Sequence, residues 1–260
     1  VKGIKLENLI ALLAKTSLNH HDFLQLAGDI SEITSLFNPR DFDMWRFLGL
    51  NLMKLDNGKI TLKTRETDIC DEIFCIVDIE TSGGIHSGQI IEIGAVKVQN
   101  FKEIGRFCSF AKANEIPAEI TELTGISVAD VASAPSLANV MEKFRLFLGN
   151  SVFVAHNVRF DYDFISSTLE KLGFGMLLNR RICTIELARR TIAAQKYGLQ
   201  SLKDQLGIKN QHHRALSDAL ACRAIFETSI KRLPWYVQTS EDLITFSKTA
   251  PCMKIIEIKK

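Results

Sequence analysis

The spacing of the hydrophobic residues changes along the chain and separates a helical N-terminal part from a longer part in which strands and helices alternate. Within residues 6–13 and 23–30 the apolar residues recur three and four positions apart, as on one face of a helix. A third short helix is expected at 41–48, and the Asn-Gly pair inside 56–59 favours a tight hairpin turn between two short strands. The pattern therefore predicts a small helical domain with a hairpin over residues 1–66.

Beyond a polar stretch at residues 64–68, which predicts a linker, short apolar runs alternate with helical patterns. Strands are expected at 73–81, 89–98, 105–110, 152–155 and 181–184, the first three as a meander. Helices are expected at 136–148, 158–172, 185–195 and 214–230. This alternation predicts the α/β class, with a mixed β-sheet flanked by helices, over residues 70–232.

Both ends of the chain leave alternatives open. Three helices followed by a hairpin resemble a winged-helix domain, but nine basic and nine acidic residues up to residue 68 balance one another, so a protein-contact role is an equal alternative to DNA binding. In the C-terminal tail, residues 233–260, a short helix is expected near 241–246. Its Leu243 and Phe246 either pack back onto the preceding domain or dock onto a partner such as a sliding clamp.

The composition is that of an ordinary globular protein, because 46% of the 260 residues are hydrophobic and 24% are charged. A net charge of +2 does not by itself indicate nucleic-acid binding. No apolar run approaches the roughly 20 residues that span a bilayer, so no membrane partner is expected. The six cysteines lack any zinc-binding spacing, which predicts reduced thiols and a cytoplasmic location.

Two carboxylates interrupt a near-continuous apolar run in the expected strand Ile73–Thr81. Residues two apart in a strand share a face, so Asp78 and Glu80 project side by side. Two neighbouring anions at the end of an apolar strand repel each other and lose hydration, which a divalent cation such as Mg²⁺ would offset. The alternative is an exposed strand end on which both groups are solvated.

Two more acids fall on the apolar faces of expected helices. Asp161 shares a stripe with Ile165, although an acid in a first helical turn also compensates the helix dipole. Asp218 lies on the apolar face of the last helix, where an acid needs a partner. His212 and His213 are both candidates to join it from the preceding loop, and a lone histidine is otherwise structural or solvated.

Three short motifs hold these residues. They are Asp-x-Glu-Thr at 78–81, His-Asn-x-x-Phe-Asp at 156–161 and His-x-Ala-x-x-Asp at 213–218. In this order and spacing they resemble the DEDDh (DnaQ-like) 3′–5′ exonucleases, which include the proofreading epsilon subunit of bacterial DNA polymerase III. The stretches at 89–95 and 116–126 also look like this family, so the resemblance covers roughly residues 73–230.

The resemblance implies a ribonuclease H-like fold and four carboxylate ligands for two Mg²⁺ or Mn²⁺ ions: Asp78, Glu80, Asp161 and Asp218. His213 would then act as the general base that takes a proton from the attacking water. The same resemblance implies substrate contacts from three further residues: Thr81, Asn157 and Phe160. Asn157 also suits the N-cap of the helix that carries Asp161.

The implied activity is hydrolysis of terminal phosphodiesters at the 3′ end of single-stranded or frayed DNA, which releases nucleoside 5′-monophosphates. A proofreading role in replication or repair would follow, with a polymerase subunit or a sliding clamp as protein partner. Two alternatives stay open: the same chemistry on RNA, as in oligoribonucleases, and a catalytically silent scaffold that binds nucleic acid. The first motif continues as Ser-Gly-Gly at 82–84, where relatives often have Thr-Gly or Ser-Gly, so contacts to the terminal nucleotide are expected to differ.

Overall fold

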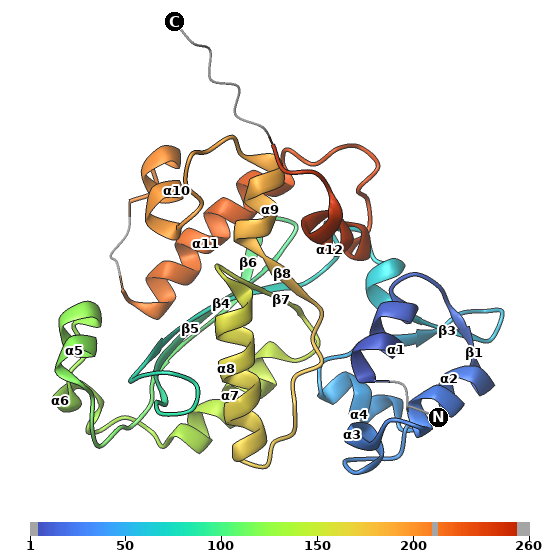
Figure 1. Ribbon diagram of the computed structural model, residues 1–260, viewed down its shortest axis with the longest axis horizontal. Helices are drawn as coiled ribbons and strands as arrows, with labels where there is room; N and C mark the ends of the chain where they lie inside the picture. Colours follow the sequence, from blue (N-terminus) through green and yellow to red (C-terminus); the bar gives the residue numbers. More distant parts are fainter. Residues whose placement is uncertain (1–4, 210–212, 254–260) are drawn as a thin grey trace, which may run out of the picture.

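A five-stranded mixed sheet forms the centre of the chain in the computed structural model, which describes residues 5–209 and 213–253 (Figure 1). Its strands are β4 (Phe74–Thr81), β5 (Ile90–Gln99), β6 (Lys102–Phe110), β7 (Val152–Ala155) and β8 (Arg181–Cys183). They lie in the order β6-β5-β4-β7-β8, with β4, β5 and β6 antiparallel and β7 and β8 parallel to β4. The predicted mixed sheet and the meander of its first three strands are confirmed.

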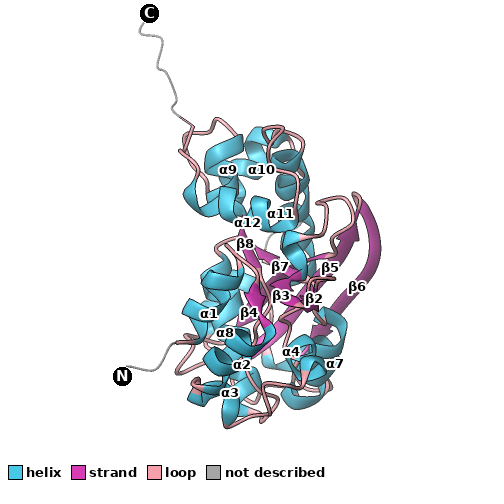
Figure 2. Ribbon diagram, turned by 90° about the vertical axis from the view of Figure 1, so that its right-hand side faces the viewer, coloured by secondary structure: helices cyan, strands magenta, loops and turns pink. Residues whose placement is uncertain are grey.

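Helices cover both faces of this sheet, as Figure 2 shows, so the architecture is α/β as predicted. One face carries α7 (Leu137–Leu148) and α8 (Val158–Lys171); the other carries α9 (Thr184–Thr191), α11 (Ala215–Ile230) and α12 (Ser240–Thr249), with α10 (Leu199–Leu206) against α11. Between β6 and α7 lie α5 (Ala118–Thr124) and α6 (Val128–Val131). The hydrophobic spacing does not predict α5, α6 or α10, because helices of four to eight residues contain too few turns for a clear period.

The alternation of side chains along β4 determines which layer each one meets. The odd-numbered residues of 75–79 pack into the core beneath α7 and α8. Phe74 and Ile76 pack into the opposite core, beneath α11 and α12. Because side chains two apart share a face, Asp78 and Glu80 continue the second row and point toward the α11 side of the sheet.

The N-terminal part packs around a second core, which Leu178 from the segment before β8 also enters, and it has a small sheet. Its helices are α1 (Leu6–Leu13), α2 (His20–Gly28), α3 (Ser31–Thr34) and α4 (Phe42–Phe47), and its strands β1 (Leu18–Asn19), β2 (Leu52–Lys54) and β3 (Lys59–Leu62) pair in the order β1-β3-β2. Trp45 is fully buried in the core, and its indole N–H donates to the carbonyl of Pro39 at 3.0 Å. The expected helices and hairpin are present, and β1, which the hydrophobic spacing does not predict, pairs with the hairpin. The winged-helix-like assignment of this domain is our proposal.

The stretch at residues 64–68 is not the exposed linker that its polarity predicts. Lys63–Arg65 forms a 3₁₀ turn, and buried Thr64 donates a hydrogen bond to Glu241 Oε2 at 2.7 Å. Glu241, on α12, also accepts hydrogen bonds from the guanidinium of Arg180. The prediction failed because polar residues that are paired inside a protein have the same composition as exposed ones. A buried polar network therefore joins the N-terminal domain to α12 and to the start of β8.

The C-terminal tail is also built into the fold as far as it is described. Leu243, on α12, is fully buried in the core beneath α11, and Phe246 packs against the same core. The interpretation that both residues dock onto a sliding clamp is therefore wrong, because Leu243 has no exposed surface for a partner. Residues 254–260 lie outside the described part of the chain. No helix within residues 5–209 and 213–253 is both long and apolar enough to cross a membrane.

Candidate active site

Two acids of β4 lie at the end of the sheet that faces α11. Asp78 is opposite Gly94 of β5, and Glu80 is opposite Glu92, across the antiparallel ladder. Both acids are half-buried, and the ladder shifts its register directly after Glu80, before Thr81. Such an irregularity interrupts pairing and bends the strand. The two acids therefore lie where the regular sheet ends.

Asp161 reaches the same place from the other helical layer. The helix α8 begins directly after β7, which is parallel to β4, so its N-terminus lies at the same edge of the sheet as the end of β4. Asp161 is 3% exposed, and this burial raises its pKa to about 8. Hydrogen bonds from the backbone N–H groups of Asp161 itself and of Ile79 lower the pKa, but by less. The charge of Glu80 adds to the rise. Asp161 thus belongs to one acidic cluster with the β4 residues.

Asp218 and His213 complete the cluster from the start of α11. Asp218 is 5% exposed and accepts a hydrogen bond from the backbone N–H of His213 at 3.0 Å. Ligand atoms of Glu80, His213 and Asp218 all lie within 4.8 Å of one another. His213 lies in the loop before α11 with a left-handed φ of 53°, whereas His212 falls outside the described residues. The imidazole of His213 is therefore close to two of the four acids.

An ion pair between a buried glutamate and a half-exposed arginine fixes the start of α11, and the motifs alone do not predict it. Glu92 is 1% exposed and binds the guanidinium of Arg214, with 2.9 Å between Nη2 and Oε1. The same carboxylate accepts the backbone N–H of Ala215 at 3.1 Å. Next to it, a Cβ on Gly94 would lie 2.1 Å from the backbone nitrogen of Leu216, so only glycine lets the helix approach the sheet this closely. An acid inside an otherwise apolar strand is the signal that could have revealed Glu92.

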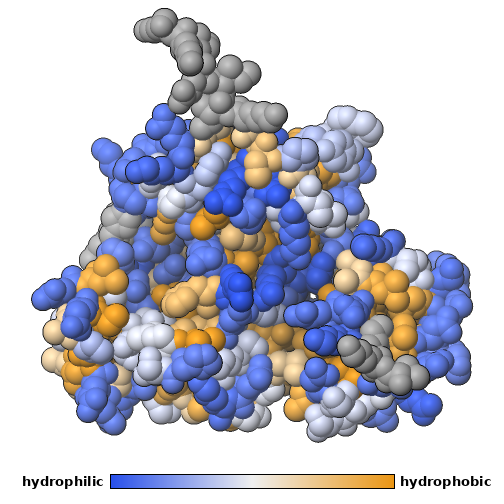
Figure 3. All heavy atoms as spheres, viewed as in Figure 1, coloured by the Kyte–Doolittle hydropathy of each residue, from blue (hydrophilic) through white to orange (hydrophobic). Residues whose placement is uncertain are grey.

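The three expected substrate residues border the acids without being part of the acidic cluster. Asn157 occupies the N-cap position of α8 but has a left-handed φ of 68°, and its side chain makes no capping hydrogen bond. The predicted N-cap position is thus confirmed, but the side chain does not cap the helix, because a capping side chain requires extended backbone at that position. Phe160 is 45% exposed in the first turn of α8. Figure 3 shows hydrophilic side chains over much of this face of the molecule, with apolar ones among them. Thr81 Oγ1 donates to the carbonyl of Gly83 at 2.9 Å and so supports the loop after β4.

The second motif also contains a histidine, His156, whose environment differs from that of His213. His156 Nδ1 lies 2.9 Å from Thr184 Oγ1, inside the fold. Burial lowers the pKa of His156 to about 4. The imidazole is therefore neutral at pH 7 and poorly suited to bind a proton, whereas His213 lies within the acidic cluster and is the candidate base.

The acidic cluster carries more negative charge than the protein around it compensates. Burial raises the pKa of Asp78 well above its ordinary value, and the charges of Asp161, Glu80, Asp218 and Glu92 raise it further. Burial and the neighbouring acids likewise raise the pKa of Glu80 to about 7. The donors are carboxylate oxygens and one imidazole, which suit hard divalent cations such as Mg²⁺ or Mn²⁺. The residues present thus fit a divalent metal site.

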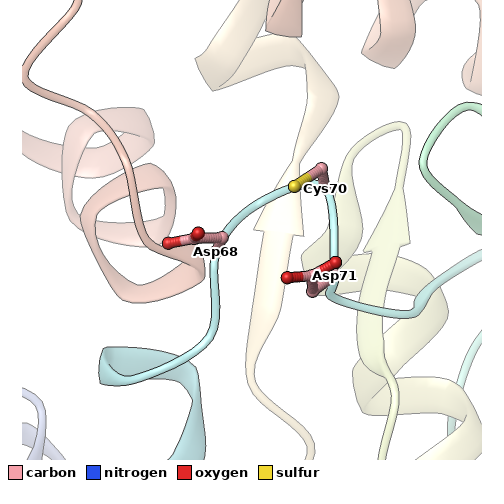
Figure 4. Close-up of side chains that lie close together, drawn as sticks. All are labelled: Asp68, Cys70 and Asp71. Atoms are coloured by element: carbon pink, nitrogen blue, oxygen red, sulfur yellow. The ribbon is translucent and has the colours of Figure 1, made fainter.

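A second group of potential ligands lies on the loop before β4, at the opposite end of the strand from Glu80. Figure 4 shows Asp68, Cys70 and Asp71 close together, with their ligand atoms within 4.8 Å of one another. All three are exposed to water. Their charges are therefore already solvated, and nothing comparable to the burial of Asp161 or Asp218 requires a cation there.

Comparison with known proteins points to the same part of the chain as the acidic cluster. The family model described as Exonuclease matches residues 75–226, which contain the whole acidic cluster. DNA polymerases III of the PolC type from Staphylococcus aureus (strain bovine RF122 / ET3-1) and Staphylococcus epidermidis (strain ATCC 12228 / FDA PCI 1200) are each 36% identical to the chain over 191 residues. The match covers 71% of this chain and 13% of each polymerase. The chain thus spans about an eighth of the length of these relatives.

Solved structures show the same fold. Exonuclease X in complex with 5′-overhanging duplex DNA has 26% identity and a TM-score of 0.53, over 67% of this chain and 99% of that one. E. coli exonuclease I in complex with a dT13 oligonucleotide has 17% identity and a TM-score of 0.56, over 62% of this chain and 42% of that one, which supports the fold alone. The central sheet and its helices therefore have the ribonuclease H-like exonuclease fold.

In excess chelator, the stability of the chain should fall as pH rises from about 5 to about 8.5. Glu80 and Asp161 have pKa values of about 7 and about 8 in the folded chain, above the ordinary values of 4.5 and 3.8. At a pH between the ordinary and the folded pKa of such a carboxyl group, the group keeps its proton in the folded state and loses it in the unfolded state. The folded state therefore binds more protons over this range. The free energy of unfolding is therefore largest at low pH and falls as pH rises through the folded values. Urea unfolding midpoints across this range measure the effect.

Asp161→Asn should make this pH dependence shallower, because it removes one buried titrating group. Asp163→Asn is the matched control, since Asp163 lies two residues further along α8 and has 43% of its side chain exposed. Equal slopes for the wild type and Asp161→Asn would contradict the account.

Gly94→Ala should lower the free energy of unfolding by about 1–3 kcal/mol, because the added methyl collides with the backbone of Leu216 and displaces the start of α11. Thermal or urea unfolding measures the loss. Gly198→Ala serves as control, because a Cβ at Gly198 meets nothing within 4 Å. Similar stabilities for the two variants would show that the close approach of α11 to β5 has no energetic weight.

Proposed function

This chain belongs to the exonuclease family, and on that premise we propose that it removes nucleotides stepwise from the 3′ end of single-stranded or frayed DNA and releases nucleoside 5′-monophosphates. One observation carries the proposal: four carboxylates from three separate motifs converge with His213 at one edge of the ribonuclease H-like sheet. A catalytically silent scaffold would have no use for acids such as Asp78 and Glu80, whose pKa values are raised by burial and by neighbouring acids.

The metal ligands in this proposal are the four acids of the cluster: Asp78, Glu80, Asp161 and Asp218. They would hold two Mg²⁺ or Mn²⁺ ions. When bound, such ions would stabilise the negative charge that develops on the attacking and leaving oxygens of the phosphodiester. The raised pKa values of Asp78 and Glu80 support this assignment, because burial and the charges of neighbouring acids both disfavour the ionised carboxylates, which a bound cation would favour.

His213 is the proposed general base. Its side chain is exposed and lies beside Glu80 and Asp218, so it can accept a proton from the attacking water and pass it to solvent. The hydrogen bond from its backbone N–H to Asp218 holds the loop that carries it.

Thr81, Asn157 and Phe160 are proposed to bind the terminal nucleotide. The Thr81 hydroxyl is engaged with the loop at Gly83, so Thr81 is proposed to contact the nucleotide through its backbone. The side chain of Asn157 is not used as a helix cap, and the exposed ring of Phe160 offers a surface for an unpaired base. The same surfaces could accept RNA, since a choice between sugars depends on contacts to the 2′ position.

A proofreading role within replication or repair extends the proposal. The PolC-type relatives are DNA polymerases by name, and the chain matches 13% of their length, so a polymerase subunit is the protein partner that we propose. All six cysteines of the chain are free thiols, as suits the reducing cytoplasm in which DNA is replicated.

His213→Ala should lower the rate of DNA hydrolysis by roughly 10²–10⁴-fold, because a general base contributes about that much. Stabilisation of the fold by Mn²⁺ should be largely kept, because the four acids remain. His212→Ala is the control and should cost much less activity. If His212→Ala were the more damaging change, the third motif would be wrongly registered on this sequence.

The substrate preference should follow strand fraying. Unpairing an end costs a few kcal/mol and least at a mismatch, so single strands should be degraded faster than mismatched ends, and mismatched ends faster than paired ones. Matched DNA and RNA single strands labelled at the 5′ end would give the polarity, the step size and the sugar preference in one assay. A blocked 3′ terminus should slow the enzyme strongly. Equal cutting of a closed circular strand and a linear one would reveal an endonuclease instead.

A further inference from the structure

A lysine is buried against the acidic cluster. Lys203, on α10, is 2% exposed, and its Nζ lies 3.8 Å from Oδ1 of Asp218. Asp218 is itself 5% exposed. Lysine is almost never fully buried unless it is paired with an opposite charge. An ammonium group enclosed in the fold beside a proposed metal ligand is therefore a specific feature of this site.

The position of Lys203 follows from the packing of α10 onto α11 (Figure 1). The neighbouring residue Leu202 is fully buried and shares an apolar cluster with Ile225 of α11 and Ala188 of α9. This contact fixes α10 on the helix that carries Asp218. The ammonium group consequently cannot move into solvent without disrupting the packing of two helices.

The charges around the cluster identify the partner of this lysine. Five carboxylates lie together: Asp78, Glu80, Glu92, Asp161 and Asp218. Arg214 is bound to Glu92, which is not one of the four proposed metal ligands. Lys203, by contrast, is paired with a proposed ligand. Its positive charge offsets part of the negative charge of Asp218, as a divalent cation would do.

We infer that Lys203 is an internal counter-ion of Asp218, a positioning residue that holds this acid in the metal-free chain and weakens the binding of divalent metal. The inference rests on the metal site of the proposed function. A fixed positive charge attracts the same carboxylate as the metal and repels an arriving cation. Because Lys203 is buried, solvent ions screen its charge only weakly. Lys203 thus raises the metal concentration at which the cluster fills.

Isothermal titration of the full chain with Mn²⁺, without DNA, tests this directly. Lys203→Met keeps the approximate length of the side chain and removes the charge, so Mn²⁺ should bind about three- to tenfold more tightly than to the wild type. Lys203→Arg keeps the charge and should stay within about twofold of the wild type. Lys209→Met is the matched control, because Lys209 is an exposed lysine on the segment that follows α10, and it should change nothing.

Thermal unfolding separates a counter-ion from a packing residue. In chelator, Lys203→Met should melt below the wild type, because Asp218 loses this positive charge and stays among other acids. Saturating Mn²⁺ should narrow this gap, because the metal replaces the missing charge. A residue that only packs would show the same gap under both conditions. Lys203→Gln repeats the comparison if the Met variant does not fold.

Unchanged or weaker Mn²⁺ binding in both neutral variants would overturn the inference. A wild-type chain that binds no Mn²⁺ would overturn both the inference and the metal site. Tighter binding in the neutral variants, in a chain that fails to degrade DNA, would support the counter-ion role while refuting the exonuclease proposal.

Discussion

The structure depends on one electrostatic constraint, the repulsion among carboxylates that three segments bring together at the end of β4. Burial raises the pKa of Asp161 to about 8, and burial together with the neighbouring acids raises that of Asp78 well above its ordinary value. Such an arrangement opposes folding unless a cation or protons reduce the charge. The rest of the domain has to hold these acids in place against their repulsion. In a metal-dependent exonuclease this cost is consistent with function, because the unfavourable charge is what gives divalent ions their affinity.

Several contacts supply that support, and they differ in kind. Parallel pairing of β7 with β4 brings the N-terminus of α8, and hence Asp161, to the end of β4. The Glu92–Arg214 pair and the absent side chain of Gly94 bring α11, and hence Asp218, down onto β5. The N-terminal domain makes its buried polar contacts elsewhere, through Glu241 on α12. The contacts that hold the acidic cluster are thus different from the buried polar contacts that attach the N-terminal domain.

The sequence was sufficient to predict the elements that depend on interactions between residues close together in the chain. The apolar run of β4 and the two-residue spacing of Asp78 and Glu80 were sufficient to predict a strand that presents two acids on one face. The segment around Thr64 was misjudged, because its buried partner Glu241 lies 177 residues further along the chain. The ion pairs of Glu92 and Lys203 were missed for the same reason, because the sequence does not show whether a charged residue is solvated or paired. Asn157 occupies the predicted N-cap position, but its left-handed backbone, with a φ of 68°, keeps its side chain from making the capping hydrogen bond.

Anomalous diffraction from crystals of the chain grown with Mn²⁺ tests the central claim most directly. Two peaks about 4 Å apart, bound by the carboxylates of Asp78, Glu80, Asp161 and Asp218, are the predicted result. Peaks found only at other sites, such as the exposed group of Asp68, Cys70 and Asp71, would contradict it. The repulsion among the acids at the end of β4 would then destabilise the fold with no metal ion to offset it.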